Sequence, residues 1–467
     1  MNHYLAIAAS TGLVAALLAF AHPAVAITIP VNDATQDLVD DNPGDGVCHT
    51  TAGTCTLRAA FMEANHASGA GATISIPAGI YRLTRSATIV GCAGDDETCG
   101  DLNLTAGSPV ITITGAGAAT TIIDANQIDR VLNIDSGRSV SISGVTMRNG
   151  YLDCGSGAGI FNSGALTLSH STLEGNEAHQ IGCASDGSGG GLYNSGTATI
   201  STSTFLGNKA DLSGGGIFNS GGTVDLADST IVDSMAQVGG GIFNHINGSL
   251  YVTASTINRN AATAGSGGGI ANVAVLFVTN STISGNSASV DGGGIFNEYY
   301  FANIYNTTIV FNGANLDHSS GGTAGGVYNA DAHGASFTLR DTLIAGNYDD
   351  GTRLNDECTG TLNSYLRNLI GIDPSTVGCT VVLKSGYWQN LNGLSFLGPL
   401  QNNGGPTRTH ALLPGSNAID YGSYLGCTGA DGNPLLTDQR GFKRPVGVVC
   451  DMGAYEYNDV IFANGFQ

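Results

Sequence analysis

Gly214-Gly-Gly-Ile-Phe-Asn219 decides the fold of this chain, because the same six-residue phrase keeps returning along it. The phrase stands unchanged at 239–244 and 292–297. Close variants occupy 157–162, 189–194, 267–272 and 324–329. The closing residues, 25 to 32 positions apart, are Asn162, Asn194, Asn219, Asn244, Asn272, Asn297 and Asn329. Self-similarity at a period of roughly 20–50 residues predicts a solenoid or a propeller.

The content of each repeat favours the solenoid. The units contain short β-type runs, such as Leu166-Thr-Leu168 and Tyr251-Val252, separated by glycine, asparagine and serine. A propeller blade would need four strands in about 40 residues. Shorter units fit one coil of a right-handed parallel β-helix, in which three short strands complete a turn and successive coils stack at about 4.8 Å. The sequence therefore predicts an all-β fold, a single-stranded right-handed parallel β-helix.

The recurring asparagines are expected to bond to one another between coils. A second phrase, close to Ser-Thr-Ile-x-x-Asn, recurs at 171–176, 203–208, 255–260, 281–286 and 307–312. An asparagine that returns at the same corner of each coil can donate to the coil above and accept from the coil below. We therefore interpret the asparagines of the first phrase as a structural ladder.

An aromatic column precedes that ladder. The residue before each corner asparagine is aromatic in six repeats, and Ala271 interrupts the series. The aromatic positions are Phe161, Tyr193, Phe218, Phe243, Phe296 and Tyr328. If the preceding aliphatic residue points inward, strand alternation turns these rings outward, where they could contact the apolar faces of sugars. The alternative is structural: the corner turns the rings into the core, or the rings stack only on one another.

Composition and the first residues indicate export. The formal net charge is −21 and only 11% of residues are charged, which argues against nucleic acids and anionic membrane surfaces as partners. Residues 5–20 are mainly apolar, and Ala24-Val25-Ala26 fits a signal-peptidase site. We expect residues 1–26 to be a signal peptide and the mature protein to be secreted, without a membrane span and monomeric.

Ten cysteines are expected to form disulfides in an oxidising compartment. They fall into pairs of sequence neighbours: Cys48/Cys55, Cys92/Cys99, Cys154/Cys183, Cys358/Cys379 and Cys427/Cys450. Zinc-type Cys-x-x-Cys spacing does not occur. Connectivity is a hypothesis at this stage.

The two ends of the repeats look like caps. Leu57, Ala60, Phe61 and Ala64 have the spacing of an amphipathic helix, with Thr56 or Thr54 as its N-cap. Cys55-Thr-Leu-Arg-Ala-Ala resembles the Cys-Ser-Leu-Arg-Glu-Ala motif of secreted bacterial β-helix proteins. We divide the chain into a signal peptide (1–26), an N-terminal cap (27–71), the β-helix (72–395, regular over 150–347), a C-terminal cap (396–457) and a tail (458–467).

Two further resemblances concern the repeats and the C-terminal cap. The Gly-Gly-Gly-Ile and Thr-Ile-x-x-Asn phrases resemble repeats of the polymorphic outer-membrane proteins, which are surface-displayed adhesins with a C-terminal membrane barrel that this chain has no room for. The stretch 397–420, with Asp438-Gln-Arg-Gly441 and Cys450-Asp-Met-Gly-Ala-Tyr-Glu456, resembles the choice-of-anchor Q segment of secreted β-helix proteins. These resemblances imply a secreted or surface-displayed protein of a Gram-negative bacterium. Residues 461–467 resemble a short tail of exported xanthomonad proteins.

Catalytic motifs are sparse. Polygalacturonase-type Gly-His-Gly and Arg-Ile-Lys motifs do not occur, and the pairs Asp40-Asp41, Asp95-Asp96 and Asp349-Asp350 are expected to be solvated or to bind calcium at the surface. We predict no catalytic residue, no metal-ligand set and no cofactor.

The basic residues do not form one site either. Arg148, Lys209 and Arg259 flank the second asparagine corner in alternate coils, so about 10 Å separates each from the next, too far for one sugar to contact all three. The densest polar group is His410, Asp420, Asp438, Arg440 and Arg444. We interpret it as a hydrogen-bonded lock, because buried charges need partners.

The sequence predicts a non-catalytic adhesin, or a protein that binds a polysaccharide or cell-surface glycan. The alternative is a polysaccharide lyase or glycoside hydrolase that acts on an acidic polysaccharide. A third hypothesis is a protease-resistant scaffold without a ligand.

Overall fold

The computed structural model describes most of the chain. The described residues are 26–67, 71–86, 97–107, 110–183, 187–315, 322–349, 356–371, 378–385, 387–390, 396–424 and 426–458. All but the last residue of the predicted signal peptide, and all but the first of the tail, lie outside these ranges.

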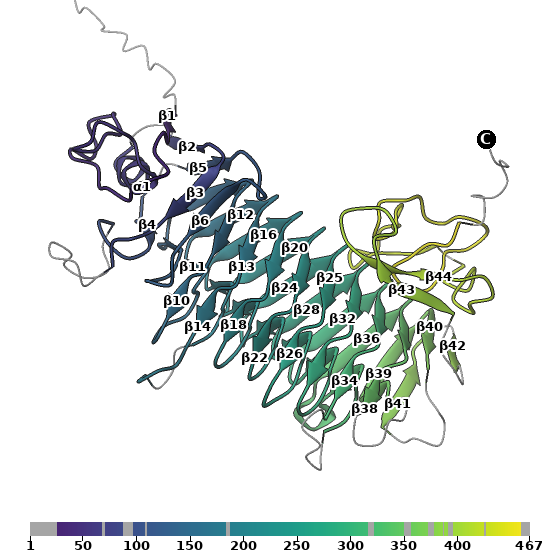
Figure 1. Cartoon of the computed structure of the whole chain (residues 1–467). Coiled ribbons are helices and arrows are strands. Elements are labelled where there is room, and N and C mark those ends of the chain that lie inside the picture. The colour runs from purple at the N-terminus through teal and green to yellow at the C-terminus, as the bar shows by residue number, and fades with distance from the viewer. Residues whose placement is uncertain are drawn as a thin grey trace, which may run out of the picture.

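The chain winds into a parallel β-helix, as the repeats predict (Figure 1). One regular coil passes through β11 (Ile160–Asn162), β12 (Ala165–Ser169), β13 (Thr172–Glu174) and β14 (Glu177–Ala178). Each strand pairs in parallel with its counterpart one coil away; Asn162, for example, faces Asn194. The sequence predicted three strands per coil, and the two-residue strand represented by β14 is a fourth.

Four stacks of strands run along the axis, and we name them by their content. The asparagine sheet contains β4 (Leu102–Leu104), β7 (Leu132–Ile134), β11, β15 (Leu192–Asn194), β19 (Ile217–Asn219), β23 (Ile242–Asn244), β27 (Ile270–Asn272), β31 (Ile295–Asn297) and β35 (Val327–Asn329). The long sheet contains β1 (Ile27–Pro30), β2 (Ala72–Ile76), β5 (Ile111–Gly115), β8 (Ser139–Ser143), β12, β16 (Thr197–Ser201), β20 (Thr223–Ala227), β24 (Ser249–Thr253), β28 (Val275–Thr279), β32 (Phe301–Tyr305), β36 (Ser336–Arg340), β39 (Cys358–Tyr365) and β41 (Cys379–Leu383). Strand β39 pairs with both β35 and β36 and so joins these two sheets.

The other two stacks complete each coil. The threonine sheet contains β3 (Gly79–Arg82), β6 (Thr121–Asp124), β9 (Thr146–Arg148), β13, β17 (Thr204–Leu206), β21 (Thr230–Val232), β25 (Thr256–Asn258), β29 (Thr282–Ser284), β33 (Thr308–Val310), β37 (Leu343–Ala345), β40 (Arg367–Ile370) and β42 (Tyr387–Asn390). The narrow sheet contains β10 (Tyr151–Leu152), β14, β18 (Lys209–Ala210), β22 (Met235–Ala236), β26 (Ala261–Ala262), β30 (Ser287–Ala288), β34 (Gly313–Ala314) and β38 (Tyr348–Asp349).

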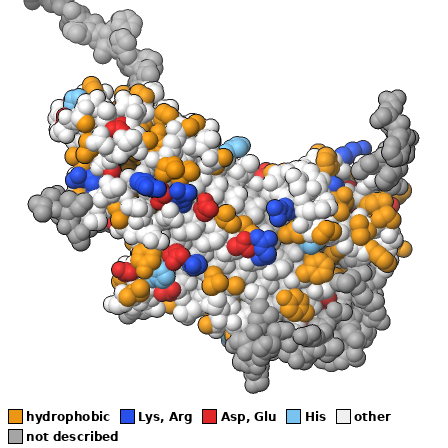
Figure 2. Space-filling model, viewed as in Figure 1, with side chains coloured by type: hydrophobic (Ala, Val, Ile, Leu, Met, Phe, Trp, Pro, Cys, Tyr) orange, Lys and Arg blue, Asp and Glu red, His pale blue; other side chains and the backbone are white. Residues whose placement is uncertain are grey.

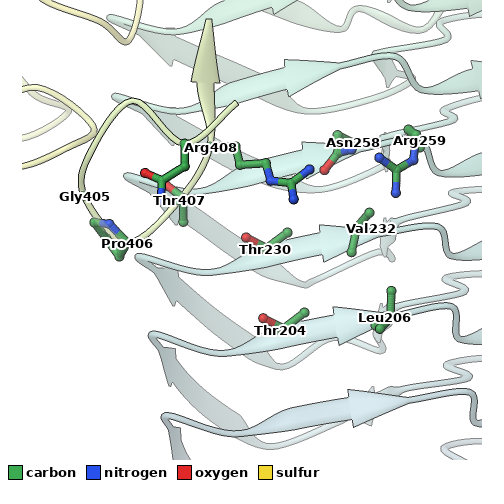
Figure 3. Close-up of a pocket in the computed structure, with 11 residues that line it drawn as sticks. Thr204, Leu206, Thr230, Val232, Asn258, Arg259, Gly405, Pro406, Thr407 and Arg408 are labelled. Atoms are coloured by element: carbon green, nitrogen blue, oxygen red, sulfur yellow. The ribbon is translucent and has the colours of Figure 1, made fainter. Parts of the chain in front are cut away.

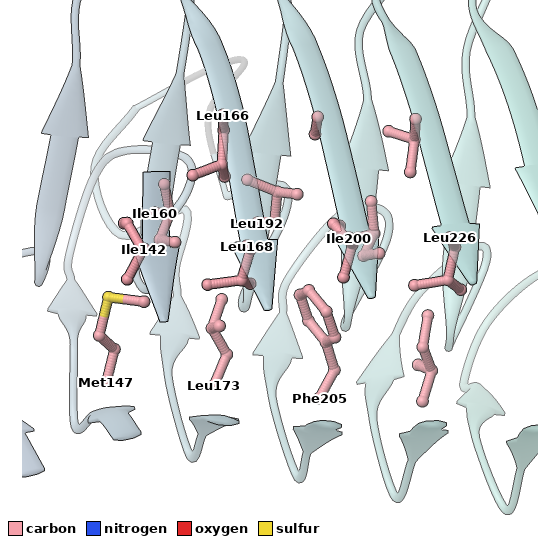
Figure 4. Packing of buried hydrophobic residues seen from close by; sticks show 14 of the residues in the cluster. Ile142, Met147, Ile160, Leu166, Leu168, Leu173, Leu192, Ile200, Phe205 and Leu226 are labelled. Carbon is pink, nitrogen blue, oxygen red and sulfur yellow. The ribbon is translucent and has the colours of Figure 1, made fainter. Parts of the chain in front are cut away.

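The core is a set of aliphatic columns that alternation directs inward. Figure 4 shows Ile160 and Leu192 from the asparagine sheet beside Leu166 and Ile200 from the long sheet. Leu173 and its stacked neighbours reach the same space from the threonine sheet. Buried side chains of this size each contribute about 1.5–3 kcal/mol, so the core stability accumulates coil by coil along the axis.

The asparagine ladder is confirmed. Each Nδ2 donates to the Oδ1 of the next corner asparagine, from Asn162 through to Asn329, at 2.7–2.9 Å. Six of the seven corner asparagines have no exposed surface, and Asn329 is 2% exposed. The ladder therefore fixes the register of neighbouring coils from inside the wall.

The glycines before the ladder permit this close stacking. Gly214 has φ +66°, which a side chain rarely adopts, and a Cβ on Gly215 would lie 2.4 Å from the Met235 carbonyl oxygen. The phrase is conserved between repeats of this one chain because the coil has space only for glycine at those points.

A second ladder of asparagine side chains lies at the corner after the threonine sheet, and its last amide bonds a glutamate. Asn260 and Asn286 continue to Asn312 and Asn347 through 2.9 Å bonds. The Asn347 amide then donates to Glu357 Oε2 at 2.6 Å. Burial raises the pKa of Glu357 to about 7, against the effect of these hydrogen bonds.

The N-terminal cap contains the predicted helix, α1 (Leu57–Asn65), and Thr56 is its N-cap, accepting from the Ala59 amide. Arg58 is fully buried, and its guanidinium bonds both Asp37 and the backbone carbonyls of Gly100 and Asp101. The helix thus covers the first coils and is held there by a paired buried charge.

The C-terminal cap packs along the side of the last coils (Figure 1). The cap contains a hairpin of β43 (Leu397–Gln401) and β44 (Thr409–Leu412). A short 3₁₀ helix, η1 (Asp331–His333), is not part of the cap and follows β35. Gln439 accepts from Thr282 Oγ1 at 2.6 Å and donates to Thr256 Oγ1 at 3.0 Å. The cap therefore covers the outer face of the threonine sheet from Thr256 onward.

Four predicted disulfides are present: Cys48–Cys55, Cys154–Cys183, Cys358–Cys379 and Cys427–Cys450. Cys92 lies outside the described residues, so its pairing with Cys99 stays a prediction.

Removing one ladder amide should destabilise the protein. In Asn219→Ala the side chains of Asn194 and Asn244 each lose a buried partner, and we expect a loss of about 3 kcal/mol, because each unsatisfied group costs about 1–3 kcal/mol. Urea unfolding measures the change. Thr199→Ala, on an exposed position of β16, is the control and should cost less than about 0.5 kcal/mol; equal losses would contradict the ladder's role.

Candidate functional site

The predicted aromatic column lies on the outer surface of the asparagine sheet. Its rings are half-buried, while the residues on either side of each ring are buried. The corner therefore does not turn the rings into the core, and that structural alternative is excluded. Ala271 is fully buried where it interrupts the column.

The rings contact one another face to face. Phe161 and Tyr193 have centroids 4.8 Å apart with planes 4° apart, and Phe218 and Phe243 have centroids 5.4 Å apart at the same angle. His245 lies against Phe218 and Phe243. Because neighbouring rings cover each other's faces, the column presents ring edges to solvent over most of its length. Its ligand-binding role stays a prediction.

A second aromatic group leaves more ring surface exposed: Tyr299 and Tyr300 lie in the turn between β31 and β32, Phe301 begins β32, and His333 lies in η1. We call Tyr299, Tyr300, Phe301 and His333 the turn cluster. Tyr300 is 53% exposed and Phe301 is 39% exposed. Tyr299 stacks on the His333 imidazole at 4.8 Å, and the four residues line a cavity of about 430 Å³ together with Ser336.

The turn cluster continues onto the long sheet. Phe301 meets Phe277 edge to face, with centroids 5.9 Å apart, and Phe277 stacks on Tyr251. The turn also follows Phe296, which stacks on Tyr328. Aromatic side chains of both sheets therefore meet around one corner of the solenoid.

Sequence reasoning missed this cluster because it searched for repeating positions. Tyr299-Tyr300-Phe301 occurs once, after a corner where the other repeats have no aromatic ring except His245 and His333. The signal was present as three consecutive aromatic residues in a chain with 7% aromatic residues.

A groove lies where the C-terminal cap begins to cover the threonine sheet (Figure 3). Its floor contains Thr204 and Thr230, and the cap loop at Gly405–Arg408 forms one wall. Its volume is about 420 Å³, and the Arg259 and Arg408 side chains lie on it. The described lining contains two guanidinium groups and no carboxylate or imidazole, so it suits an anion better than proton transfer.

The three basic residues of the repeats are engaged separately, as their spacing predicts. Arg148 bonds Asp124 at 3.0 Å, Lys209 bonds Glu177 at 2.9 Å, and Arg259 bonds Asp233 at 2.6 Å. Paired blue and red groups of this kind lie across the face seen in Figure 2. The hydrogen bond and charge of Asp233 raise the pKa of Arg259, which makes this guanidinium a poorer base.

A polar cluster on the narrow sheet looks catalytic but is fully paired. His179 Nε2 lies 3.2 Å from Glu177 Oε2, and His179 Nδ1 lies 3.2 Å from Asp211 Oδ1. Tyr151 packs on the imidazole at 4.9 Å. Because carboxylate oxygens lie 3.2 Å from both ring nitrogens, this imidazole is held in place by its neighbours.

The C-terminal polar group is largely the hydrogen-bonded lock that the sequence predicted. Arg440 bonds Asp438 Oδ2, at 2.8 Å through Nε and 2.6 Å through Nη2. Arg444 bonds Glu456 at 3.0 Å with both side chains fully buried, and its Nη1 donates to Asn280 on the β-helix. His410 bonds Ser284 Oγ at 2.8 Å, and burial lowers its pKa.

Asp420, the remaining member of this group, is exposed. It has φ +54° and lines a small cavity with Asp451. Burial, reinforced by Glu456, raises the pKa of Asp451 to about 7. Asp341, Cys427 and Cys450 also lie close together, but the two sulfurs are joined in a disulfide and are not free to bind metal.

Comparison with known proteins does not show a family for this chain. No family model matches the chain. No curated protein matches it either. One similar solved structure is "Crystal structure of pectate lyase Pel9A", at 13% identity and a TM-score of 0.38 over 93% of this chain and 98% of that one. Among the described residues, no helix is long and apolar enough to cross a membrane.

Truncating the aromatic column should test whether its rings are structural. In Phe218→Ala with Phe243→Ala, three stacked contacts are removed, each worth about 0.5–1.5 kcal/mol beyond area burial. We expect a lower melting temperature by differential scanning calorimetry. An unchanged melting temperature with weaker retention on glycan columns would instead assign these rings to ligand binding.

The buried acid Asp341 should make stability depend on pH. Burial raises its pKa to about 7, although Arg444 opposes the effect. The fold therefore favours the protonated form, so the stabilising contribution is complete below about pH 4 and is lost as pH rises through about 7. Wild-type melting temperature should fall between pH 5 and pH 8. Asp341→Asn, at a residue with φ +47° that asparagine tolerates, should make this fall smaller, by about 1.4 kcal/mol for each unit of pKa shift, while Glu357 and Asp451, whose pKa values burial also raises to about 7, keep the rest; an unchanged slope would contradict the assignment.

Proposed function

We propose that this chain is a secreted, non-catalytic protein that binds a polysaccharide or a cell-surface glycan through the turn cluster. The observation that carries the proposal is the exposed aromatic surface of Tyr300 and Phe301 beside a cavity of about 430 Å³. Soluble proteins seldom expose grouped aromatic side chains without a binding role.

The chemistry of the turn cluster suits a sugar. A sugar ring has an apolar C–H face, which packs on an aromatic face, and a rim of hydroxyl groups, which need hydrogen-bond partners. Tyr299 and Tyr300 supply phenolic hydroxyls, and His333 and Ser336 add a ring nitrogen and a hydroxyl. The Glu298 carboxylate lies 3.5 Å from His333 Nδ1 and adds an acceptor beside the cavity.

Neighbouring aromatic residues would extend the contact to a polymer. Phe296 and Tyr328 border the turn on the asparagine sheet, and Tyr251 and Phe277 border it on the long sheet. A glycan chain crossing the corner would therefore find apolar surface on both sides of the cavity. A polymer fits this extended surface better than a small metabolite.

Export is supported by the disulfides and by the ends of the sequence. Four disulfides favour an oxidising compartment. The first 26 residues have the pattern of a signal peptide. The resemblances of both caps to secreted β-helix proteins point the same way, to display at or beyond the surface of a Gram-negative bacterium.

The alternative is a lyase or hydrolase that acts on an acidic polysaccharide at the groove. The guanidiniums of Arg259 and Arg408 favour an anionic ligand there. Proton abstraction needs a group that is deprotonated near neutral pH, and Asp233 holds Arg259 in its charged form. Binding without cleavage is therefore the simpler reading of the groove.

The turn cluster is tested by Tyr300→Ala with Phe301→Ala in the mature protein. We expect at least tenfold weaker retention in affinity electrophoresis through immobilised plant and bacterial polysaccharides, because two exposed rings are lost. Melting temperature should fall only modestly, since Tyr300 is 53% exposed and Phe301 39% exposed, although the contact of Phe301 with Phe277 is lost. Tyr424→Ala, at a 69% exposed ring in the cap, is the matched control and should bind like wild type.

Two results would contradict the proposal. Equal retention of the wild-type protein and the double variant on every polymer would remove the turn cluster as a site. New unsaturated ends or reducing sugars, released from uronic-acid polymers by wild type and abolished in Arg259→Ala, would establish the enzyme alternative at the groove.

A further inference from the structure

A loop of the N-terminal cap brings one histidine and two aspartates together, in a part of the chain separate from the turn cluster. Asp40, Asp41 and His49 each offer a ligand atom, and these atoms all lie within 4.8 Å of one another. His49 follows Cys48, whose disulfide to Cys55 ties the loop to the start of α1.

The loop has a fixed shape. Glu63 of α1 accepts from the Gly44 amide at 2.6 Å and from the Gly46 amide at 2.7 Å. The Asp41 amide donates to the His49 carbonyl at 3.1 Å, which closes the loop at its base. The backbone that carries the three candidate ligands is therefore held in place before any ion arrives, which reduces the entropy lost on binding.

The second observation is a buried oxygen without a partner. Asp40 is only 4% exposed, and its Oδ1 accepts from the Asn42 amide at 3.0 Å. Its Oδ2 is buried and has no hydrogen-bond partner among the described residues. Leaving a buried polar atom unpaired costs about 1–3 kcal/mol, and more for a charged group, so this oxygen needs a proton or a cation.

The neighbouring ligand atoms are also placed for a cation. His49 Nδ1 is a buried atom that lies 2.6 Å from Asp41 Oδ1 outside hydrogen-bond geometry, so a shared ion would replace this close contact and move the two atoms apart. A positive ion among these atoms would satisfy Asp40 and offset the negative charges of Asp41 and Glu63.

We propose that Asp40, Asp41 and His49 form a binding site for a divalent first-row transition-metal ion, with Zn²⁺ as the best match. Imidazole nitrogen suits zinc and its neighbours, whereas calcium and magnesium prefer sites made of oxygen alone. The sequence left calcium open for this acidic pair, and the position of His49 shifts the choice to a softer ion. Three protein ligands leave a further position for water.

Such an ion would stabilise the fold of the N-terminal cap. It would link the two ends of the loop beside the disulfide, on the segment that positions α1 over the first coils. Binding to the folded form alone raises stability by RT ln(1 + [L]/Kd), so the melting temperature should rise with ion concentration.

The test is isothermal titration calorimetry of ZnCl₂ into chelator-treated mature protein at pH 7.5. We expect a single saturable site that His49→Asn and Asp40→Asn each weaken at least tenfold. His170→Asn and Asp225→Asn, both at exposed positions of the β-helix, are matched controls and should bind like wild type. CaCl₂ should not compete at equal concentration.

Thermal unfolding of the same samples separates loss of the site from loss of the fold. Without metal, His49→Asn should melt like wild type, and added ZnCl₂ should raise the melting temperature of wild type and of the two control variants but not that of His49→Asn. Absence of saturable zinc binding to wild type would overturn the proposal. So would zinc affinity in His49→Asn equal to that of wild type, or competition by calcium at equal concentration.

Discussion

Hydrogen bonding between stacked corner amides is the constraint on which this structure depends. Each corner asparagine has one donor and one acceptor directed along the axis, and the bonds measure 2.7–2.9 Å. A coil shifted by one residue would leave two buried amides unpaired and turn the aliphatic column outward. Register, core and surface columns are therefore set together, and the aromatic column is one consequence of that register.

The periodic part of the molecule could be predicted from sequence, because a repeat carries its own stacking rule. Asn219 above Asn244, Ile217 inward, Phe218 outward and a disulfide between Cys154 and Cys183 all follow once coils lie over one another. The direction of the ring planes did not follow, since strand alternation gives the side of the sheet but not the side-chain rotamer. In the structure Phe218 and Phe243 stack on each other, because face-to-face contact covers the most apolar area.

Features that depend on contacts between distant segments could not be predicted. The groove joins Thr230 to Arg408, and the cap lock joins Asn280 to Arg444; no period in the sequence relates these positions. The sequence indicated that the charged residues of the cap would pair, but not which residue each of them would bind. Asp438 with Arg440 was within reach because two residues separate them, whereas Glu456 as the partner of Arg444 required the folded cap.

Departures from the repeat are therefore where function is most readily placed on a solenoid. A position that stacks in every coil has its hydrogen bonds and much of its surface used by its neighbours, as the ladder asparagines do. Three segments occur only once and are not stacked in this way: the residues Tyr299–Phe301, the cap edge beside Thr230 and the loop at Asp40–His49. Their side chains can face solvent or an ion without breaking a column. The regular coils supply rigidity, and the irregular segments they support supply chemistry.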